Sequence, residues 1–143
     1  MQLIGFNFTK ISAEKKEVLG DKPTINTNIE FTDVAKDTVD LLKDFEAVRV
    51  SFRFSIAYNA NGKKDALGSI LFEGNIILSA LPEKVKEIVK AWKKKEFAPD
   101  FKIPLFNLIL RRCSAKALDL EEQTGLPPHL PLPQLKAQPP SEQ

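Results

Sequence analysis

The stretch Val48-Arg49-Val50-Ser51-Phe52-Arg53-Phe54-Ser55-Ile56-Ala57-Tyr58 decides the fold of this chain. Its even-numbered positions are all apolar or aromatic, whereas Arg49, Ser51, Arg53 and Ser55 occupy the odd positions between them. Because successive side chains of a strand point to opposite faces, this alternation predicts a strand with one buried and one solvated face. Such strands are typical of antiparallel sheets.

The same period of two predicts three further strands around this one. The first contains Ile4 to Phe8, the second Ile25 to Phe31, and the last Leu67 to Ala80. Gly74 interrupts the apolar face of the last strand, which indicates a bulge or a close approach of another backbone. Asn and Gly residues within 59–62 predict a hairpin turn between the third and fourth strands.

The segment Asp33 to Glu46 connects the second and third predicted strands. It carries Val39, Leu41, Leu42 and Phe45 among charged residues. A short helix and an ordered crossover loop both fit this pattern, and we favour the crossover.

Two helices are predicted after the strands. Pro82 suits the first turn of one helix, and the spacing of Val85, Ile88, Val89 and Trp92 predicts its buried stripe. A break at 98–100 follows. Pro104 is then predicted to start a last helix that Gly125 ends. Leu105 and Leu108 widen the apolar arc of this helix, so we expect the sheet to cover one side of it and a second subunit the other.

The chain ends in a proline-rich segment, Leu126 to Gln143. Proline fixes φ and removes a hydrogen-bond donor, so the segment is predicted to be extended. We expect Leu126 to Leu135 to be ordered and to complete the fold. Residues 136–143 have little to bury and are predicted to form a disordered tail.

Composition excludes several classes of function. The 143 residues, 43% of them hydrophobic, are enough for one core. One cysteine rules out an internal disulfide, and one cysteine with one histidine cannot build a His/Cys metal site. We expect no cofactor, no membrane-spanning segment and no secretory signal, and hence a cytoplasmic protein. Lys and Arg number 21 against 19 Asp and Glu, a net charge of +2 without the basic stripe of a nucleic-acid binder.

Candidate catalytic side chains have simpler interpretations. His129 stands among prolines and leucines and is predicted to be an ordinary surface histidine. Cys113 falls on the apolar stripe of the last helix, where a packing role fits best. Glu30 and Glu73 were weighed as enzyme carboxylates, but nothing in the sequence pairs them at a useful distance. We therefore predict that the protein is not an enzyme.

Four segments resemble the SecB-type export chaperones. Leu42 to Ser55 is similar to the start of the family's third strand, and Leu71 to Leu78 to its fourth strand. Leu110-Arg111-Arg112-Cys113 is similar to a motif of the family's last helix, and Gly125 to Pro133 to its closing Gly-x-Phe-Pro-x-Leu-x-Leu-x-Pro. The resemblance covers residues 3 to 135. It implies one α+β domain over 1–135, with a four-stranded antiparallel Greek-key sheet, two helices and a proline-rich extended segment.

The resemblance implies a non-catalytic, holdase-type chaperone that acts as a homodimer or homotetramer and binds unfolded or partner polypeptides. The residues predicted to contact such chains are Val39, Leu41, Leu42, Phe45, Leu126, Leu130 and Leu132. Those predicted at an interface between subunits are Leu105, Leu108 and Arg112.

Two features leave other functions open. The acidic surface with which the family engages the SecA motor is absent from a chain of net charge +2. Pro128-His129-Leu130-Pro131 matches the PxxP pattern that SH3-type domains bind. The alternative function is therefore an adaptor whose proline-rich segment docks a partner domain.

Overall fold

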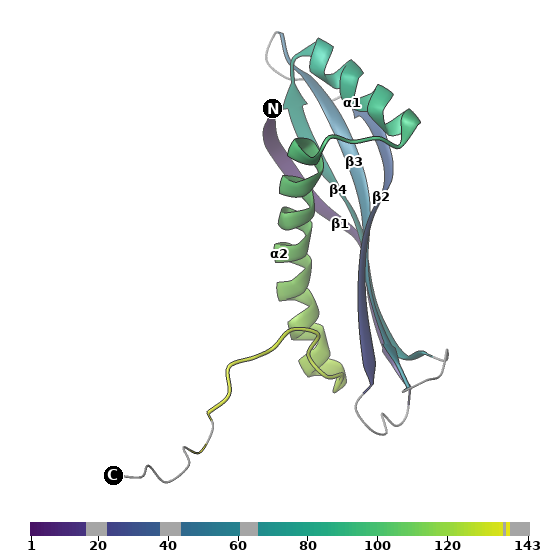
Figure 1. Cartoon of the computed structure of the whole chain (residues 1–143), viewed down its shortest axis with the longest axis vertical. Coiled ribbons are helices and arrows are strands. Elements are labelled where there is room, and N and C mark those ends of the chain that lie inside the picture. The colour runs from purple at the N-terminus through teal and green to yellow at the C-terminus, as the bar shows by residue number, and fades with distance from the viewer. Residues whose placement is uncertain (17–22, 38–43, 61–65, 136, 138–143) are drawn as a thin grey trace.

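The computed structural model describes residues 1–16, 23–37, 44–60, 66–135 and 137. Its elements follow in the order β1 (Gln2–Lys15), β2 (Thr24–Asp37), β3 (Glu46–Asn59), β4 (Ala66–Ala80), α1 (Pro82–Lys94) and α2 (Pro99–Thr124). The predicted class, an α+β fold with a four-stranded antiparallel sheet followed by two helices, is confirmed. Figure 1 shows a long twisted sheet with α2 running along it and α1 lying across one end.

The strands form a single sheet in the order β1-β4-β3-β2, and every neighbouring pair is antiparallel. β2, β3 and β4 are consecutive neighbours while β1 returns beside β4, which is a Greek-key arrangement. The predicted crossover at Asp33 to Glu46 is wrong. β2 continues to Asp37, which pairs with Ala47 of β3, so this connection joins two adjacent strands. The chain instead changes from one edge of the sheet to the other between β1 and β2.

A bulge in β2 explains why that strand is longer than its sequence pattern indicates. The register of β2 against β3 shifts between Phe31 and Asp33. The extra residue moves the alternation by one position, so Val34, and not Asp33, is buried at 3% exposure. A strict period of two therefore ends at Phe31, although the strand does not.

The predicted close approach at Gly74 is confirmed. Gly74 lies opposite Phe8 in β1, next to a register shift between Phe8 and Lys10. A Cβ atom at Gly74 would collide with the carbonyl oxygen of Asn7 and lie 2.8 Å from Cζ of Phe52. Only glycine leaves room for the β1 backbone and the Phe52 ring at the same point.

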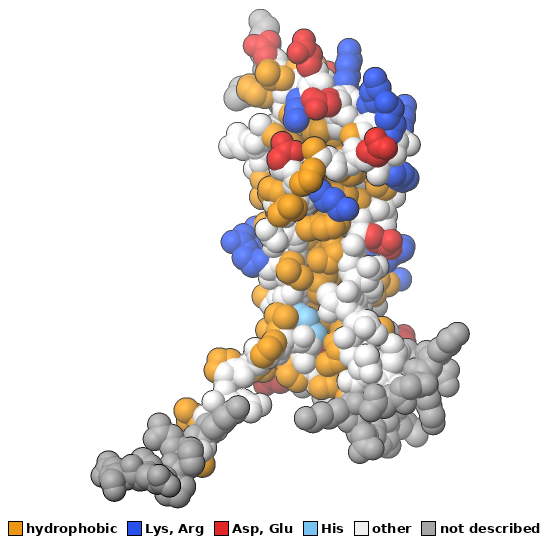
Figure 2. All heavy atoms as spheres, viewed as in Figure 1, with side chains coloured by type: hydrophobic (Ala, Val, Ile, Leu, Met, Phe, Trp, Pro, Cys, Tyr) orange, Lys and Arg blue, Asp and Glu red, His pale blue; other side chains and the backbone are white. Residues whose placement is uncertain are grey.

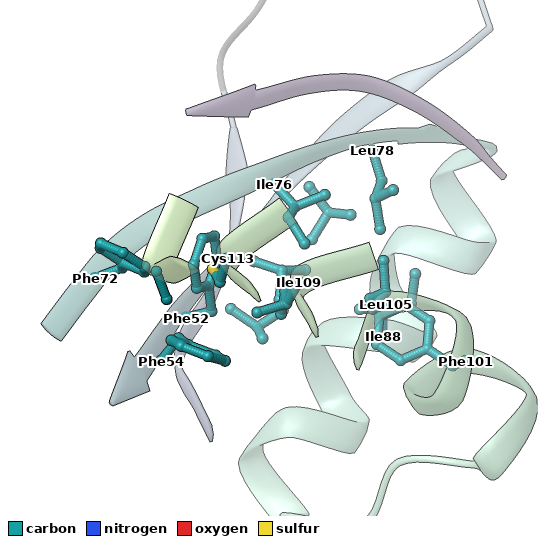
Figure 3. Close-up of a cluster of buried hydrophobic side chains, with 14 of the residues drawn as sticks. Phe52, Phe54, Phe72, Ile76, Leu78, Ile88, Phe101, Leu105, Ile109 and Cys113 are labelled. Carbon is teal, nitrogen blue, oxygen red and sulfur yellow. The ribbon is translucent and has the colours of Figure 1, made fainter. Parts of the chain in front are cut away.

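The core lies between the inner face of the sheet and the two helices (Figure 3). The inward residues of β3, from Val48 to Tyr58, are at most 1% exposed, and Ile70, Phe72 and Ile76 of β4 are fully buried. α2 covers them with Ile109, Cys113 and Ala117, each 0% exposed. The alternation that opens the sequence thus supplies the largest block of buried side chains.

The prediction that the last helix starts at Pro104 is wrong. α2 begins at Pro99, and the amides of Phe101 and Lys102 both donate to the carbonyl of Ala98. Pro104 lies inside the helix close to its start, where the missing N–H removes only one backbone hydrogen bond. At the other end the predicted stop is confirmed: Gly125 has φ 74°, the left-handed conformation that glycine adopts easily.

Among its described residues, the proline-rich segment is buried against the body only at its beginning. Leu126 is 4% exposed, and the side chain of His129 is 1% exposed. Beyond His129 the segment is exposed, with Leu130 at 41% and Leu132 at 51%. Figure 1 shows this stretch running away from the sheet and α2. The expectation that all of Leu126 to Leu135 completes the fold is therefore corrected to Leu126 through His129. Most of the predicted tail, 136 and 138–143, lies outside the described residues.

Candidate functional site

β2 forms one edge of the sheet, because among the described residues it pairs with β3 alone. A strand at an edge keeps one row of backbone N–H and C=O groups without ladder partners, so it can accept an added strand. Its inward side chains Ile29 and Phe31 are half-buried, although Val34 is buried, whereas the inward side chains of β3 are all buried. The inner face of the sheet is thus incompletely covered along β2.

An aromatic groove lies at this edge, with a volume of about 230 Å³. It is lined by Ile29, Glu30 and Phe31 of β2 and by Trp92, Lys95, Phe97, Lys102 and Phe106 of the helical part. The Phe31 ring lies 4.8 Å from Phe106 and 5.6 Å from Phe97, centroid to centroid. Trp92 stacks on Phe97 at 6.0 Å. Rings that remain half-buried in this way offer apolar contact area to a bound chain.

The connection between the helices positions the aromatic side chains of the groove. α1 ends where Lys95 adopts the left-handed conformation, φ 57°, and its amide donates to the Trp92 carbonyl. The chain reverses there, so Phe97 packs back against both Trp92 and Phe31. Pro99 then starts α2, which brings Phe106 to the other side of Phe31.

Two lysines stand over the aromatic rings of the groove. Lys95 Nζ lies 3.2 Å from the centroid of the Trp92 ring, and Lys102 Nζ lies 5.2 Å from that of Phe106. Both contacts are within the range of cation–π attraction. The rim of the groove is therefore positively charged while its walls are apolar.

Glu30 is the one acidic residue in the described lining of the groove, and its carboxylate is paired on the other face of the sheet. Arg53 of β3 donates from Nη1 to Glu30 at 2.9 Å and from Nε to Glu73 at 3.2 Å. Hydrogen bonds to Glu73 and to Glu30 raise the pKa of Arg53. One arginine thus pairs with both of the carboxylates considered as enzyme groups, and the three side chains lie on the exposed outer face of the sheet.

A buried polar triad fastens the start of the proline-rich segment. Tyr58 Oη donates to Oε2 of Glu121, and Nδ1 of His129 lies 2.8 Å from Oε1 of the same carboxylate. Glu121 is 1% exposed, and burial together with its hydrogen bond raises the pKa of Tyr58 above the usual range. The prediction of a surface histidine is wrong, because the folded chain places a hydrogen-bonding carboxylate beneath the segment. His129 Nε2 is buried without a partner among the described residues.

Cys113 has the environment of a packing residue. It is buried in the core, and desolvation raises the pKa of its thiol to about 12. A thiol that stays protonated at neutral pH is a poor nucleophile and a poor metal ligand. Within the described residues no three His, Cys, Asp or Glu side chains are grouped to hold a metal ion. None of the described helices has the length and apolar character needed to cross a membrane.

The predicted polypeptide contacts are spread over the molecule. Val39, Leu41 and Leu42 lie outside the described residues. Phe45 is 49% exposed beside Glu46, which pairs with Ala80 at the end of β4. Leu126 is in the core at the other end of β4, where its side chain lies against Gly68. Leu130 and Leu132 are exposed on the departing segment. One chain does not bring these described residues together into a single groove.

The predicted interface residues occupy three different environments. Leu105 is 5% exposed and faces the core of its own chain. Leu108 is partly buried and packs against the edge of that core. Arg112 is exposed, and its guanidinium carbon lies 4.9 Å from the centroid of the Phe6 ring of β1.

The aromatic groove was missed by the sequence analysis. The sequence places Trp92 in the buried stripe of its helix and Phe31 at the end of an alternating strand, which is correct for each element by itself. The sequence does contain a signal, the aromatic Phe97 in the short break before Pro99. A large aromatic side chain in a short interhelical turn indicates a packing contact with neighbouring elements or a place in the lining of a groove, and Phe97 has both.

Comparison with solved structures identifies the architecture. A matching structure is Mycobacterium tuberculosis Rv1957, a SecB-like chaperone in complex with a ChAD peptide from the Rv1956 HigA1 antitoxin. The match covers 96% of this chain and 91% of that chain, with a TM-score of 0.52 and 17% sequence identity. This chain has the SecB-like fold.

The resemblance read from local motifs is thereby confirmed for the fold. No family model matches the chain, and no curated protein matches it. At 17% identity the SecB-like backbone is shared although few side chains are. The chemistry of the groove therefore has to be taken from the residues of this chain.

Proposed function

We propose that this protein is a non-catalytic, holdase-type chaperone that binds extended polypeptide segments in the aromatic groove beside β2. The observation that carries the proposal is the groove itself, half-buried aromatic rings next to an unpaired strand edge. An edge offers backbone hydrogen bonds to any extended chain, and adjacent pockets accept its alternate side chains. That combination suits a protein that must hold many different unfolded sequences. The SecB-like chaperone of similar fold is described with a bound peptide, which supports this choice.

We propose further that the protein acts as a homo-oligomer. Apolar side chains are exposed on the opposite edge strand, β1, where Leu3, Ile4 and Ile11 are 41–45% exposed. Exposed apolar side chains beside a strand edge favour burial against a second copy. Leu108 and Arg112 lie four residues apart on one side of α2, where Arg112 contacts Phe6 of β1, and they are expected to contribute to this contact. Action in the cytoplasm remains a prediction of the sequence.

The peptide-binding proposal can be tested through Trp92, the only tryptophan of the chain. Its indole lines the groove, so a tryptophan-free peptide of alternating Phe and polar residues is expected to change its emission on binding. In a second assay, the protein is added to an aggregation-prone refolding client at stoichiometric ratio. The wild type should suppress aggregation, and Trp92→Ser should suppress it several-fold less.

Ile103→Ser is the matched control for the client assay. Ile103 is an apolar residue of the same end of the molecule, 55% exposed, and it does not line the groove. Equal loss of suppression in Trp92→Ser and Ile103→Ser would count against the groove as the client site. Absence of suppression by the wild type would contradict the proposal as a whole.

A second function, a partner-docking adaptor, is favoured by one observation. Leu130, Leu132 and Leu135 are 41%, 51% and 105% exposed on the proline-rich segment that leaves the body. Truncation after Leu130 separates the two functions, because the anchoring residue His129 is retained. A holdase should keep its client suppression in this variant, whereas an adaptor should lose capture of an SH3-type domain.

A further inference from the structure

A second groove lies between α1 and the paired ends of β2 and β3. Its volume is about 340 Å³, and its floor is formed by Val85 and Val89 of α1. Lys86, Lys90 and Lys93 stand along the helix beside this floor, and the Lys36–Glu46 pair closes the side formed by the strands. We call this the lysine groove. A groove with an apolar floor and charged walls suits an amphipathic polypeptide segment, whose apolar side chains contact the floor and whose charged side chains contact the walls.

The described lining of the lysine groove has an excess of positive charge. Among the described residues no carboxylate lies within ion-pair distance of Lys86, Lys90 or Lys93. Glu46, the one acidic residue in the described lining, is paired with Lys36 at 2.9 Å. Figure 2 shows several Lys and Arg side chains, with Asp and Glu side chains among them, at the end of the molecule that carries α1. Clustered like charges attract a partner of opposite sign.

The lysine groove continues the aromatic groove along the same two elements. Val89 of the lysine groove and Trp92 of the aromatic groove are three residues apart on α1, so they share one face of the helix. On β2 the lysine groove is lined by Lys36 and the aromatic groove by Ile29 to Phe31. The distance along the strand between these two sets of residues is roughly 20 Å, which a client segment of about six extended residues spans.

We propose that the lysine groove selects clients whose groove-binding segment carries a flank of Asp or Glu residues. This inference rests on the proposed function: the aromatic groove holds an apolar anchor of the client, and its acidic flank lies along Lys86, Lys90 and Lys93. Lys95 and Lys102 on the rim of the aromatic groove extend the same positive field. The two acidic residues in the described lining of the grooves, Glu30 and Glu46, each have a basic partner within the chain.

A polypeptide fits these grooves better than a nucleic acid does. The unpaired edge of β2 supplies backbone donors and acceptors in the spacing of an extended polypeptide. The described grooves contain no arginine, and Trp92 already has Lys95 stacked on its ring. Stacked bases and arginine contacts would be expected of a single-strand binder.

The test compares three tryptophan-free peptides with the same apolar core of alternating Phe residues and a flank of three Asp, Ser or Lys residues. Each is titrated into the full chain at low ionic strength, with Trp92 emission and calorimetry as readouts. We expect the Asp peptide to bind about tenfold more tightly than the Ser peptide, from three partly exposed charge contacts. The preference should shrink as salt is raised.

The variant with Lys86→Gln, Lys90→Gln and Lys93→Gln should lose the preference for Asp while binding the Ser peptide as the wild type does. Its matched control is Lys10→Gln, Lys94→Gln and Lys116→Gln, which removes the same charge at exposed positions outside both grooves. The control should keep most of the preference.

The outcomes separate this inference from the proposed function. Equal affinity for the Asp and Ser peptides, or the same loss in both triple variants, overturns the acidic preference and leaves polypeptide binding standing. Failure of all three peptides to bind overturns both. An oligothymidylate that binds as tightly as the Asp peptide, and loses binding in the groove variant, would replace the polypeptide partner with a nucleic acid.

Discussion

Glu121 is a buried acidic residue at the point where the helical layer, the sheet and the terminal segment meet. Tyr58 donates to one of its oxygens, and His129 lies within hydrogen-bond distance of the other. All three side chains are at most 2% exposed. A buried carboxylate is tolerated when its oxygens have partners, so this residue depends on the two others.

Removal of the Tyr58 hydroxyl tests that dependence. Tyr58→Phe keeps the ring but leaves Oε2 of Glu121 without its donor, and it should lower the free energy of unfolding by about 1–3 kcal/mol. The measurement is urea denaturation followed by circular dichroism. Leu132→Ala, at a 51% exposed position, is the control and should change stability by less than about 0.5 kcal/mol. If Tyr58→Phe has the same free energy of unfolding as the wild type, the Tyr58 hydroxyl does not stabilise buried Glu121.

The pH dependence of stability follows from the raised pKa values of Cys113 and Tyr58. Burial raises the pKa of Cys113 from 9.0 to about 12, and burial with the Glu121 hydrogen bond raises that of Tyr58. Below pH 9 both groups are protonated in the folded and in the unfolded chain. Their full contribution to the free energy of unfolding is therefore present there. Above pH 9 the unfolded chain releases these protons first, and stability should fall as pH approaches 12.

Cys113→Ala measures how much of this pH dependence of stability comes from the Cys113 thiol. The variant should lose stability less steeply than the wild type between pH 9 and 11, by up to about 1.4 kcal/mol per pH unit. Urea titrations at each pH measure the slope. Identical slopes in the two proteins would contradict a buried protonated thiol.

At the scale of single elements, the β1–β4 pairing depends on one missing side chain. Gly74 leaves space for the Asn7 carbonyl and the Phe52 ring, whereas a Cβ on Gly5 would meet only the Ile77 side chain at 3.5 Å. The two glycines, one in each of two paired strands, therefore provide a matched pair.

Gly74→Ala should destabilise the protein by about 1–3 kcal/mol, because either the β1 backbone or Phe52 must move. Gly5→Ala should be within about 0.5 kcal/mol of the wild type, since 3.5 Å is an ordinary contact. Thermal unfolding of both variants measures the difference. Equal stabilities would show that β1 can shift away from β4 at no cost.

For the whole molecule, the distribution of exposed apolar side chains predicts association. Ile11→Glu places a charge on β1 within the set of exposed apolar side chains that includes Leu3 and Ile4, a surface that we expect to be buried between copies. The wild type should have a mass of at least two chains by light scattering, and the variant should shift toward one chain.

Leu110→Glu is the control for this shift. Leu110 is 41% exposed and lies two residues from both Leu108 and Arg112, so it projects from a different side of α2 and a charge there should leave the mass unchanged. A wild type that remains a monomer at high micromolar concentration would contradict the oligomer proposal.

The sequence predicted well what local backbone geometry imposes. The alternation at Val48 to Tyr58 and the stripe from Val85 to Trp92 each identify an element and its buried face, because side-chain direction follows from the backbone period. Gly125 was correctly assigned as a helix end for the same local reason. The errors occurred where register mattered: the bulge after Phe31 extends β2 beyond the point at which its pattern ends.

The sequence by itself therefore determined the strands, the helices and the SecB-like order in which they follow. Only the tertiary structure decided that Tyr58, Glu121 and His129 meet in the core, and that Phe31, Trp92 and Phe97 line one groove. These groups are separated by up to 71 positions, from Tyr58 to His129, and no periodicity links them. Their meeting depends on strand register and on where each helix crosses the sheet, which are set by packing of the whole core.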